Sequence, residues 1–120
     1  MSTIKTDILV IGGGTGGVAA ALAAADHGAR VVITEPTDWI GGQFTAQAVP
    51  PDENRWIETF GGTRRYQEFR TRVRSWYRTR RVLAAPYREM PNLNPGNGWV
   101  SRLCFEPIVG HEVLLEMLGP

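Results

Sequence analysis

Three glycines and one acid near the start of the chain have the spacing of a phosphate- and ribose-binding motif. Gly12, Gly14 and Gly17 form the pattern Gly-x-Gly-x-x-Gly directly after an apolar run, and Glu35 ends a second apolar run. Glycines in such a turn let the backbone approach a pyrophosphate, and an acid further along accepts hydrogen bonds from ribose hydroxyls. These residues could therefore bind the ADP half of a dinucleotide.

The residues between the glycines and the acid also suit this motif. The remaining positions of the extended dinucleotide-binding pattern are filled by Ala21, Ala25, Gly28 and Val31. Small alanines let a helix pack closely on strands, and a glycine after the helix can take the left-handed conformation that ends it. A glycine-rich turn that binds nothing is the weaker alternative, because the whole pattern is filled. The acid at position 35 repels a 2′-phosphate, so the pattern disfavours NADP.

Hydrophobic periodicity and turn residues predict the elements that must position the motif. We expect strands at residues 6–11 and 30–35, helices at 16–27, 63–81 and 107–118, loops at 36–54 and 84–98, and a short strand at 99–105. The β-branched run at 31–33 suits a strand buried on both faces. The order of elements predicts an α/β fold, the N-terminal part of a Rossmann-like FAD/NAD(P)-binding domain.

The length of the chain is small for this type of domain. The chain has 120 residues, and the motif uses only the first 35. A Rossmann-like domain needs several parallel strands, and no further βαβ unit follows, so we expect an incomplete sheet. Residues 1–120 are therefore expected to be the N-terminal part of a dinucleotide-binding domain in a longer chain. A βαβ unit with a glycine-pair loop would span residues 1–50, and a helical and loop segment would span 51–120.

Composition narrows the classes of protein to consider. The net charge is +1, the chain has one cysteine, and no stretch is apolar and long enough to cross a membrane. One cysteine provides no disulfide framework and suits a reducing compartment, and no signal peptide is recognisable. We therefore expect a cytoplasmic protein that contacts neither membranes nor nucleic acids.

A pair of glycines follows the second predicted strand. Gly41 and Gly42 come six and seven residues after Glu35 and could let the backbone approach the cofactor a second time, although a simple turn is the alternative. Gln43 and Thr45 could then reach the cofactor with polar side chains.

The predicted helix at 63–81 is rich in arginine. The segment 55–88 holds 10 of the 13 basic residues, and Arg70, Arg74, Arg78 and Arg81 share one face of the helix. A nucleic-acid or membrane surface is one interpretation. We favour the interpretation that these arginines pair with acids elsewhere in the full protein or at a subunit interface, because the charge of the whole chain is balanced. Recognition of a substrate carboxylate or phosphate by one or two of them is a third interpretation.

The other chemically versatile residues form no convincing catalytic group. His27, His111 and Cys104 do not make a metal site, and a buried core position is expected for the cysteine. The four tryptophans are expected to be packing anchors. Because no nucleophile–base pair is recognisable, the catalytic residues stay unassigned and the chemistry would rest on a cofactor.

The whole chain resembles a known family of flavoproteins. The N-terminal pattern followed by Gly41 and Gly42 is similar to FAD-dependent oxidoreductases of the glutathione-reductase structural class. The stretches 41–47, 58–64 and 104–107 resemble a bacterial subfamily that is distantly similar to fumarate-reductase flavoproteins.

This resemblance implies a cofactor and a set of ligands. The cofactor would be FAD, bound through Gly12, Gly14, Gly17 and Glu35, with backbone N–H groups of Thr15 and Gly16 directed at the pyrophosphate and a further contribution from Gly41 and Gly42. A later segment of a longer protein would complete the flavin pocket. That protein would transfer a hydride or electrons between a small organic substrate and an acceptor, and a homo-oligomer is compatible with the sequence. An NAD-binding dehydrogenase fragment and a non-catalytic nucleotide-binding module are the alternatives.

Overall fold

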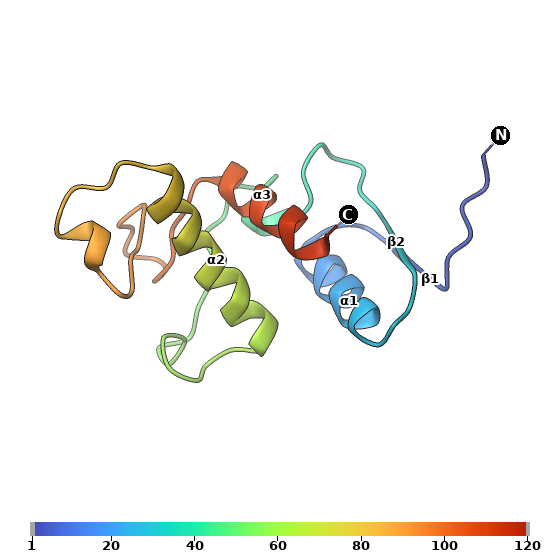
Figure 1. Ribbon diagram of the computed structural model, residues 1–120, viewed down its shortest axis with the longest axis horizontal. Coiled ribbons are helices and arrows are strands. Elements are labelled where there is room, and N and C mark those ends of the chain that lie inside the picture. Colours follow the sequence, from blue (N-terminus) through green and yellow to red (C-terminus); the bar gives the residue numbers. More distant parts are fainter. Residues whose placement is uncertain (1, 120) are drawn as a thin grey trace.

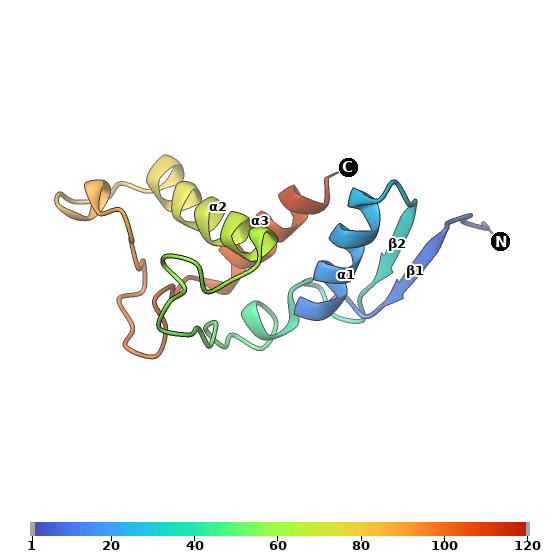
Figure 2. The same ribbon diagram turned by 90° about the horizontal axis from the view of Figure 1, so that it is seen from below.

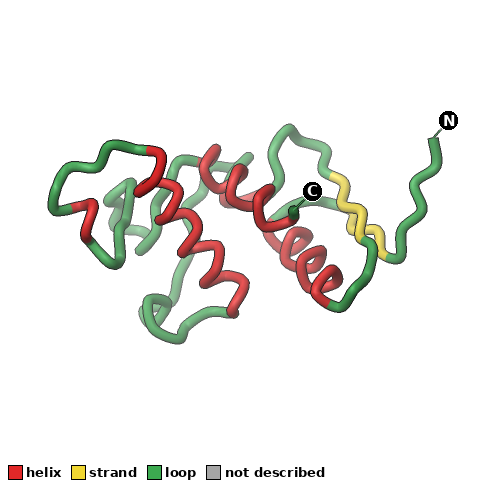
Figure 3. Tube along the Cα trace, viewed as in Figure 1, coloured by secondary structure: helices red, strands yellow, loops and turns green. Residues whose placement is uncertain are grey.

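The protein has an α/β fold with three α-helices and one small sheet in the residues described. The computed structural model describes residues 2–119. Its elements are β1 (Ile8–Ile11), α1 (Thr15–Asp26), β2 (Val31–Thr34), the short 3₁₀ helix η1 (Gly42–Phe44), α2 (Arg64–Arg80), the 3₁₀ helix η2 (Tyr87–Glu89) and α3 (Pro107–Leu118). The molecule is elongated, with extents of 53 × 28 × 23 Å. The sheet lies toward one end and the segment around η2 lies at the other (Figure 1, Figure 3).

The predicted βαβ unit is confirmed. β1 and β2 pair in parallel, with Ile8 opposite Val31 and Ile11 opposite Thr34, and α1 forms the crossover between them. Val18, Ala21 and Leu22 are the buried residues of α1. Gly28 follows the helix with a φ of +83° and donates its N–H to the Ala25 carbonyl, which is the glycine-ended helix that the sequence predicts.

Helix α3 connects the βαβ unit to α2. It packs against both α1 and α2, and Figure 2 shows it between them. Pro107 is its first residue, a position where the missing proline N–H removes no intrahelical hydrogen bond. The core cluster contains side chains from all three helices, among them Leu22, Phe69, Val73, Val109 and Val113. The helical segment is therefore packed directly onto the nucleotide-binding unit.

The strands are less buried than the sequence predicts. Residues 31–33 of β2 are only half-buried, and Leu9 and Ile11 of β1 are 54% and 83% exposed. A parallel strand is buried on both faces only when helices cover both sides of the sheet. Within residues 2–119 the sheet has two strands, and α1 is the only helix with extensive contacts to them, so the expectation of an incomplete sheet is met.

The prediction of a strand at 99–105 is wrong. The backbone of this segment is hydrogen-bonded to a side chain instead of to a neighbouring strand. The Asn94 side-chain amide donates to the carbonyls of Gly98 (3.1 Å) and Ser101 (3.0 Å), and its oxygen accepts the Cys104 N–H (2.6 Å). These bonds satisfy the backbone in a looped conformation. The Cys104 side chain is buried, as predicted.

The prediction that all four tryptophans anchor the packing is also wrong. Trp99 is 95% exposed and Trp56 is 49% exposed. Trp76 does pack against the core, and its indole N–H donates to Glu112. Trp39 stacks on His111, with ring centroids 5.9 Å apart.

Candidate functional site

The glycine turn between β1 and α1 has the geometry that its sequence predicts. Gly12 has a φ of +100°, a conformation that favours glycine, and its N–H donates to the Thr34 carbonyl. A Cβ on Gly17 would lie 1.9 Å from the Gly12 carbonyl oxygen, so the helix can approach the strand only without a side chain there. A Cβ on Gly14 would meet no atom within 4 Å, so the Gly14 position is open on the side where a ligand would approach.

The N-terminus of α1 carries four N–H groups that have no acceptor within residues 2–119. They belong to Gly14, Thr15, Gly16 and Gly17, and the first hydrogen bond of the helix runs from the Val18 N–H to the Gly14 carbonyl. No side chain caps the helix, and no acid lies in its first turn. The unpartnered N–H groups and the positive end of the helix dipole therefore form a site that suits an anion such as a pyrophosphate.

Glu35 lies directly beside this turn. A Cβ on Gly13 would be 2.9 Å from the Glu35 Oε2, which shows how closely the carboxylate approaches the glycine backbone. Its Oε1 accepts hydrogen bonds from the N–H and the hydroxyl of Thr37, both 2.9 Å long. The Thr37 N–H is the main cause that lowers the pKa of Glu35, so the group is a carboxylate at neutral pH.

The glycine pair packs against the glycine turn. The Gly41 N–H donates to the Gly13 carbonyl (2.7 Å), and the Thr15 hydroxyl donates to the Gly41 carbonyl (3.0 Å). A Cβ on Gly42 would lie 3.0 Å from the Gly14 Cα, so the two backbones are in contact. The structure thus brings the 41–43 segment to the start of α1, as a shared binding site requires.

The residues of the glycine-pair segment differ in what remains free for a ligand. Gly41 is buried, and its N–H and carbonyl are both used within the protein. Gln43 is exposed, and its side chain has no hydrogen-bond partner within residues 2–119. Thr45, which we expected to reach the cofactor, offers no free side chain to a ligand, because it is 1% exposed and its hydroxyl donates to the Ile40 carbonyl.

Two residues of this region were not identified from the sequence. Gly13 accepts the Gly41 N–H and leaves room for the Glu35 carboxylate, and Thr37 holds that carboxylate in place. The sequence did contain a signal for Thr37. A threonine two residues after an acid can donate its backbone N–H and its hydroxyl back to the carboxylate. Gly13 had no separate signal, because it lies within the motif at a position that the pattern leaves variable.

The arginine-rich face of α2 binds acids and carbonyls of the same chain. Arg70 is 2% exposed and forms ion pairs with Glu53 (2.7 Å) and Glu58 (2.8 Å), and Arg74 pairs with Glu58 (2.7 Å). Burial raises the pKa of Glu58, but the hydrogen bonds from the two arginines outweigh it and hold this pKa at about 2. The expectation of pairing with acids is confirmed, although the acids lie in this chain and not in a distant part or a second subunit.

The remaining arginines of this face also have partners. Arg78 donates to the carbonyls of Met90 and Pro91, and Arg81 donates to the Glu106 carboxylate. These bonds attach the segment after α2 to the helix. The face therefore contacts other segments of the same chain, and it is buried at Arg70 and Arg74 and exposed at Arg78 and Arg81.

Comparison with known proteins identifies the family. A family model described as FAD dependent oxidoreductase matches residues 7–119. The chain belongs to this family. The cofactor of the family is FAD, and the residues around the α1 N-terminus suit it, because they offer free N–H groups for a pyrophosphate and an ionised carboxylate beside them.

Similar proteins include three oxidoreductases of different kinds. An N,N-dimethylglycine/sarcosine dehydrogenase of Chromohalobacter salexigens is 43% identical over 63 residues, which are 52% of this chain and 9% of that protein. A glutathione reductase of Schizosaccharomyces pombe is 44% identical over 50 residues, 42% of this chain and 11% of that protein. A hydroxyneurosporene desaturase of Rhodobacter capsulatus is 52% identical over 46 residues, 38% of this chain and 9% of that protein. The chain thus matches about a tenth of the length of each relative, and no solved structure matches it.

The described part of the chain contains neither a helix that could span a membrane nor a group of residues that could hold a metal ion. None of its helices has the length and apolar character needed to cross a membrane. Within residues 2–119, no three residues among the histidines, cysteines and acids lie close enough together to hold a metal ion.

Proposed function

We propose that this chain binds the ADP half of FAD at the N-terminus of α1. The observation that carries the proposal is the set of four unpartnered N–H groups, from Gly14 to Gly17, next to the ionised Glu35. The N–H groups would hold the pyrophosphate, and Glu35 would accept hydrogen bonds from the ribose hydroxyls. Gly12 shapes the turn, and the open space at Gly14 lets the phosphates come close.

The glycine pair would extend this site. Gly42 lies against Gly14, so its backbone and the exposed Gln43 side chain would border the bound cofactor. Gly41 would position the glycine pair against the turn. It would make no hydrogen bond to the cofactor, since its N–H and carbonyl are already bonded to Gly13 and Thr15. We assign residues 1–50 to nucleotide binding and residues 51–120 to the helical and loop segment that supports it.

The reaction follows from the family. FAD supplies the capacity to accept or donate a hydride or electrons, so we infer that the complete enzyme oxidises or reduces a small organic substrate and passes the electrons to an acceptor. The role of this chain is to bind and orient the cofactor by its adenosine diphosphate end. No nucleophile–base pair is recognisable in its sequence, so the chemistry would rest on the cofactor.

The test is a binding titration with ADP and FAD, because every residue of the proposed ADP site lies in this chain. Gly14→Val should weaken both ligands by about tenfold or more, since the added side chain fills the approach of the pyrophosphate. Gly14 has a φ of −65°, so valine causes no backbone strain there. Ala23→Val, at an exposed position of α1, is the matched control and should leave both affinities unchanged.

Two results would overturn the proposal. One is equal FAD affinity of the wild-type protein and Gly14→Val. The other is tighter binding of NAD than of FAD in direct competition, which would favour an NAD-dependent enzyme, because Glu35 suits both dinucleotides.

A further inference from the structure

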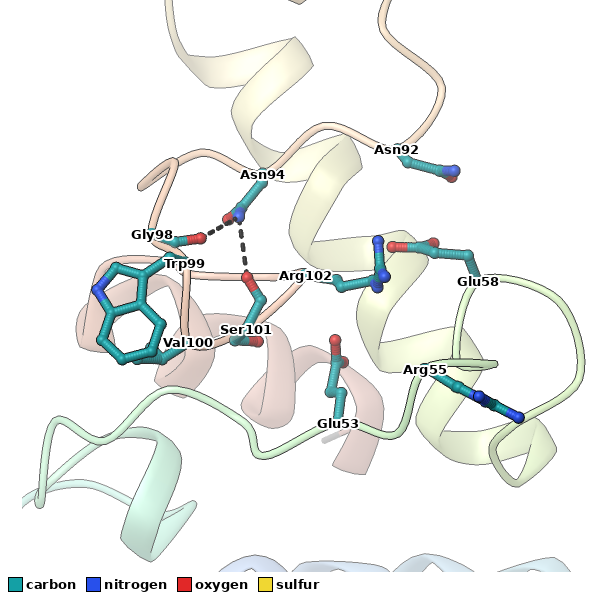
Figure 4. A pocket seen from close by; sticks show the side chains of 10 residues that line it. All are labelled: Glu53, Arg55, Glu58, Asn92, Asn94, Gly98, Trp99, Val100, Ser101 and Arg102. Atoms are coloured by element: carbon teal, nitrogen blue, oxygen red, sulfur yellow. Dashed lines mark hydrogen bonds between the residues drawn. The ribbon is translucent and has the colours of Figure 1, made fainter.

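Two arginines of the chain have no acidic or carbonyl partner within residues 2–119, and both line the same cavity. They are Arg55 and Arg102, whereas every other arginine is bonded to a carboxylate or a backbone carbonyl. The cavity has a volume of about 520 Å³ and lies between the loop at 53–58 and the segment at 92–102 (Figure 4). It is separate from the residues of the glycine turn.

The inner wall of the cavity is neutral and fixed. Glu53 and Glu58 line it, with side chains 1% and 16% exposed, and both are paired with the arginines of α2 behind them. Arg70 and Arg74 balance these two carboxylates. The excess charge of the cavity is therefore the positive charge of Arg55 and Arg102.

The two free arginines lie in different positions. Figure 4 shows Arg102 extending into the cavity on the side of Glu58, with which it forms no ion pair, while Arg55 is turned toward the outer rim. The Arg55 guanidinium lies 4.5 Å from the centre of the Trp56 ring. Arg102 is thus the group placed to contact a ligand, and Arg55 adds positive charge at the entrance.

Polar groups with unused hydrogen-bonding capacity complete the lining. The Asn92 side chain has no partner within residues 2–119, and the Ser101 hydroxyl accepts the Leu103 N–H but donates to no acceptor there. Ser101 is 6% exposed, so its hydroxyl is held within the wall. Asn94 fixes this side of the cavity through its bonds to Gly98 and Ser101 (Figure 4).

We propose that this cavity binds a small organic carboxylate, which pairs with the Arg102 guanidinium. A guanidinium matches a carboxylate in a bidentate geometry. Glu58 is not available to the ligand, because Arg70 and Arg74 donate to both of its carboxylate oxygens. The volume lies within the range of small-molecule sites. The proposal does not depend on FAD binding at α1.

The experiment is an NMR titration of the protein with L-lactate. The reporters are the Arg102 Nε–H and the Trp99 indole N–H, because Trp99 lies at the rim of the cavity. L-lactamide, which has the same shape without the charge, and inorganic phosphate are the comparison ligands. Arg102→Gln is the test variant. Arg64→Gln is the matched control, because Arg64 is 86% exposed and lies outside the cavity.

We expect saturable shifts of both reporters with lactate and binding at least about tenfold weaker with lactamide. Arg102→Gln should weaken lactate binding by about tenfold or more, read from the Trp99 signal, while Arg64→Gln leaves it unchanged. Equal binding of lactate and lactamide, unchanged binding in Arg102→Gln, or binding of phosphate without lactate would each overturn the proposal. Absence of any saturable shift would do the same. ADP titration of the same variants separates this outcome from a failure at the α1 site, since Arg102→Gln should bind ADP normally.

Discussion

Replacing Gly17 by alanine tests the closest contact in the nucleotide-binding unit. The added Cβ would lie 1.9 Å from the Gly12 carbonyl oxygen and 3.0 Å from the Gly12 carbonyl carbon. Both atoms belong to backbone, so no side chain can rotate away. The helix and the strand would have to separate by roughly 1.5 Å to restore an ordinary contact.

The magnitude follows from two opposing terms. Overpacking between rigid elements costs about 3 kcal/mol at the upper end of its usual range. The alanine recovers about 0.5–1 kcal/mol, because glycine is the poorer helix former. We therefore expect Gly17→Ala to lower the free energy of unfolding by about 2 kcal/mol, which corresponds to a fall in Tm of roughly 5–10 °C for a chain of this size.

The neighbouring residue provides the matched control. Gly16 lies in the same helical turn, but a Cβ there would meet no atom within 4 Å. Gly16→Ala should therefore raise stability by about 0.5 kcal/mol through helix propensity alone. Thermal unfolding followed by circular dichroism without any nucleotide compares the two variants. If Gly17→Ala melts at or above the temperature of Gly16→Ala, the close contact is not what the motif requires.

Three other changes test the interactions that support the site. Glu58→Gln leaves the buried Arg70 without one of its carboxylates and should cost about 3 kcal/mol in urea unfolding at pH 7. Because the pKa of Glu58 falls from 4.5 to about 2 on folding, its stabilisation is complete above pH 4.5 and is lost as the pH falls toward 2. The difference between wild type and Glu58→Gln should shrink over that window, and a constant difference would contradict the pairing. Thr15→Val removes the hydrogen bond from the hydroxyl to the Gly41 carbonyl, and it should lower the free energy of unfolding by about 1 kcal/mol and weaken FAD binding. Thr15→Ser keeps the hydroxyl and should keep the stability and FAD affinity of the wild type. Asn94→Ala removes three bonds to the backbone and should cost about 2–3 kcal/mol in the same unfolding assay, and a loss below 0.5 kcal/mol, on the order of a surface change, would show that the loop is held by other contacts.

The sequence predicted the βαβ unit well because its signals are local. Glycine spacing fixes the turn, and the helix between the strands begins at Thr15 instead of residue 16 and ends at Asp26 instead of 27. Helix α2 was predicted within one residue at each end for a similar reason, since apolar side chains recur along one face. The same reasoning failed at 99–105, where we expected a short strand. The Asn94 side chain, which acts across several residues, holds that segment as a loop.

Residue types alone determined that this chain carries a glycine turn, a helix with free N–H groups at its start and an acid at the end of the second strand. Those features depend on the conformational freedom of glycine and on the periodicity of helices and strands, which neighbouring residues set. The tertiary structure decided that the Gly41 backbone is bonded to Gly13 and Thr15, that Glu53 and Glu58 neutralise Arg70 and Arg74, and that Arg55 and Arg102 line one cavity. These arrangements join segments far apart in sequence, and long-range packing selects the partner of each charge from many acids of equal chemistry.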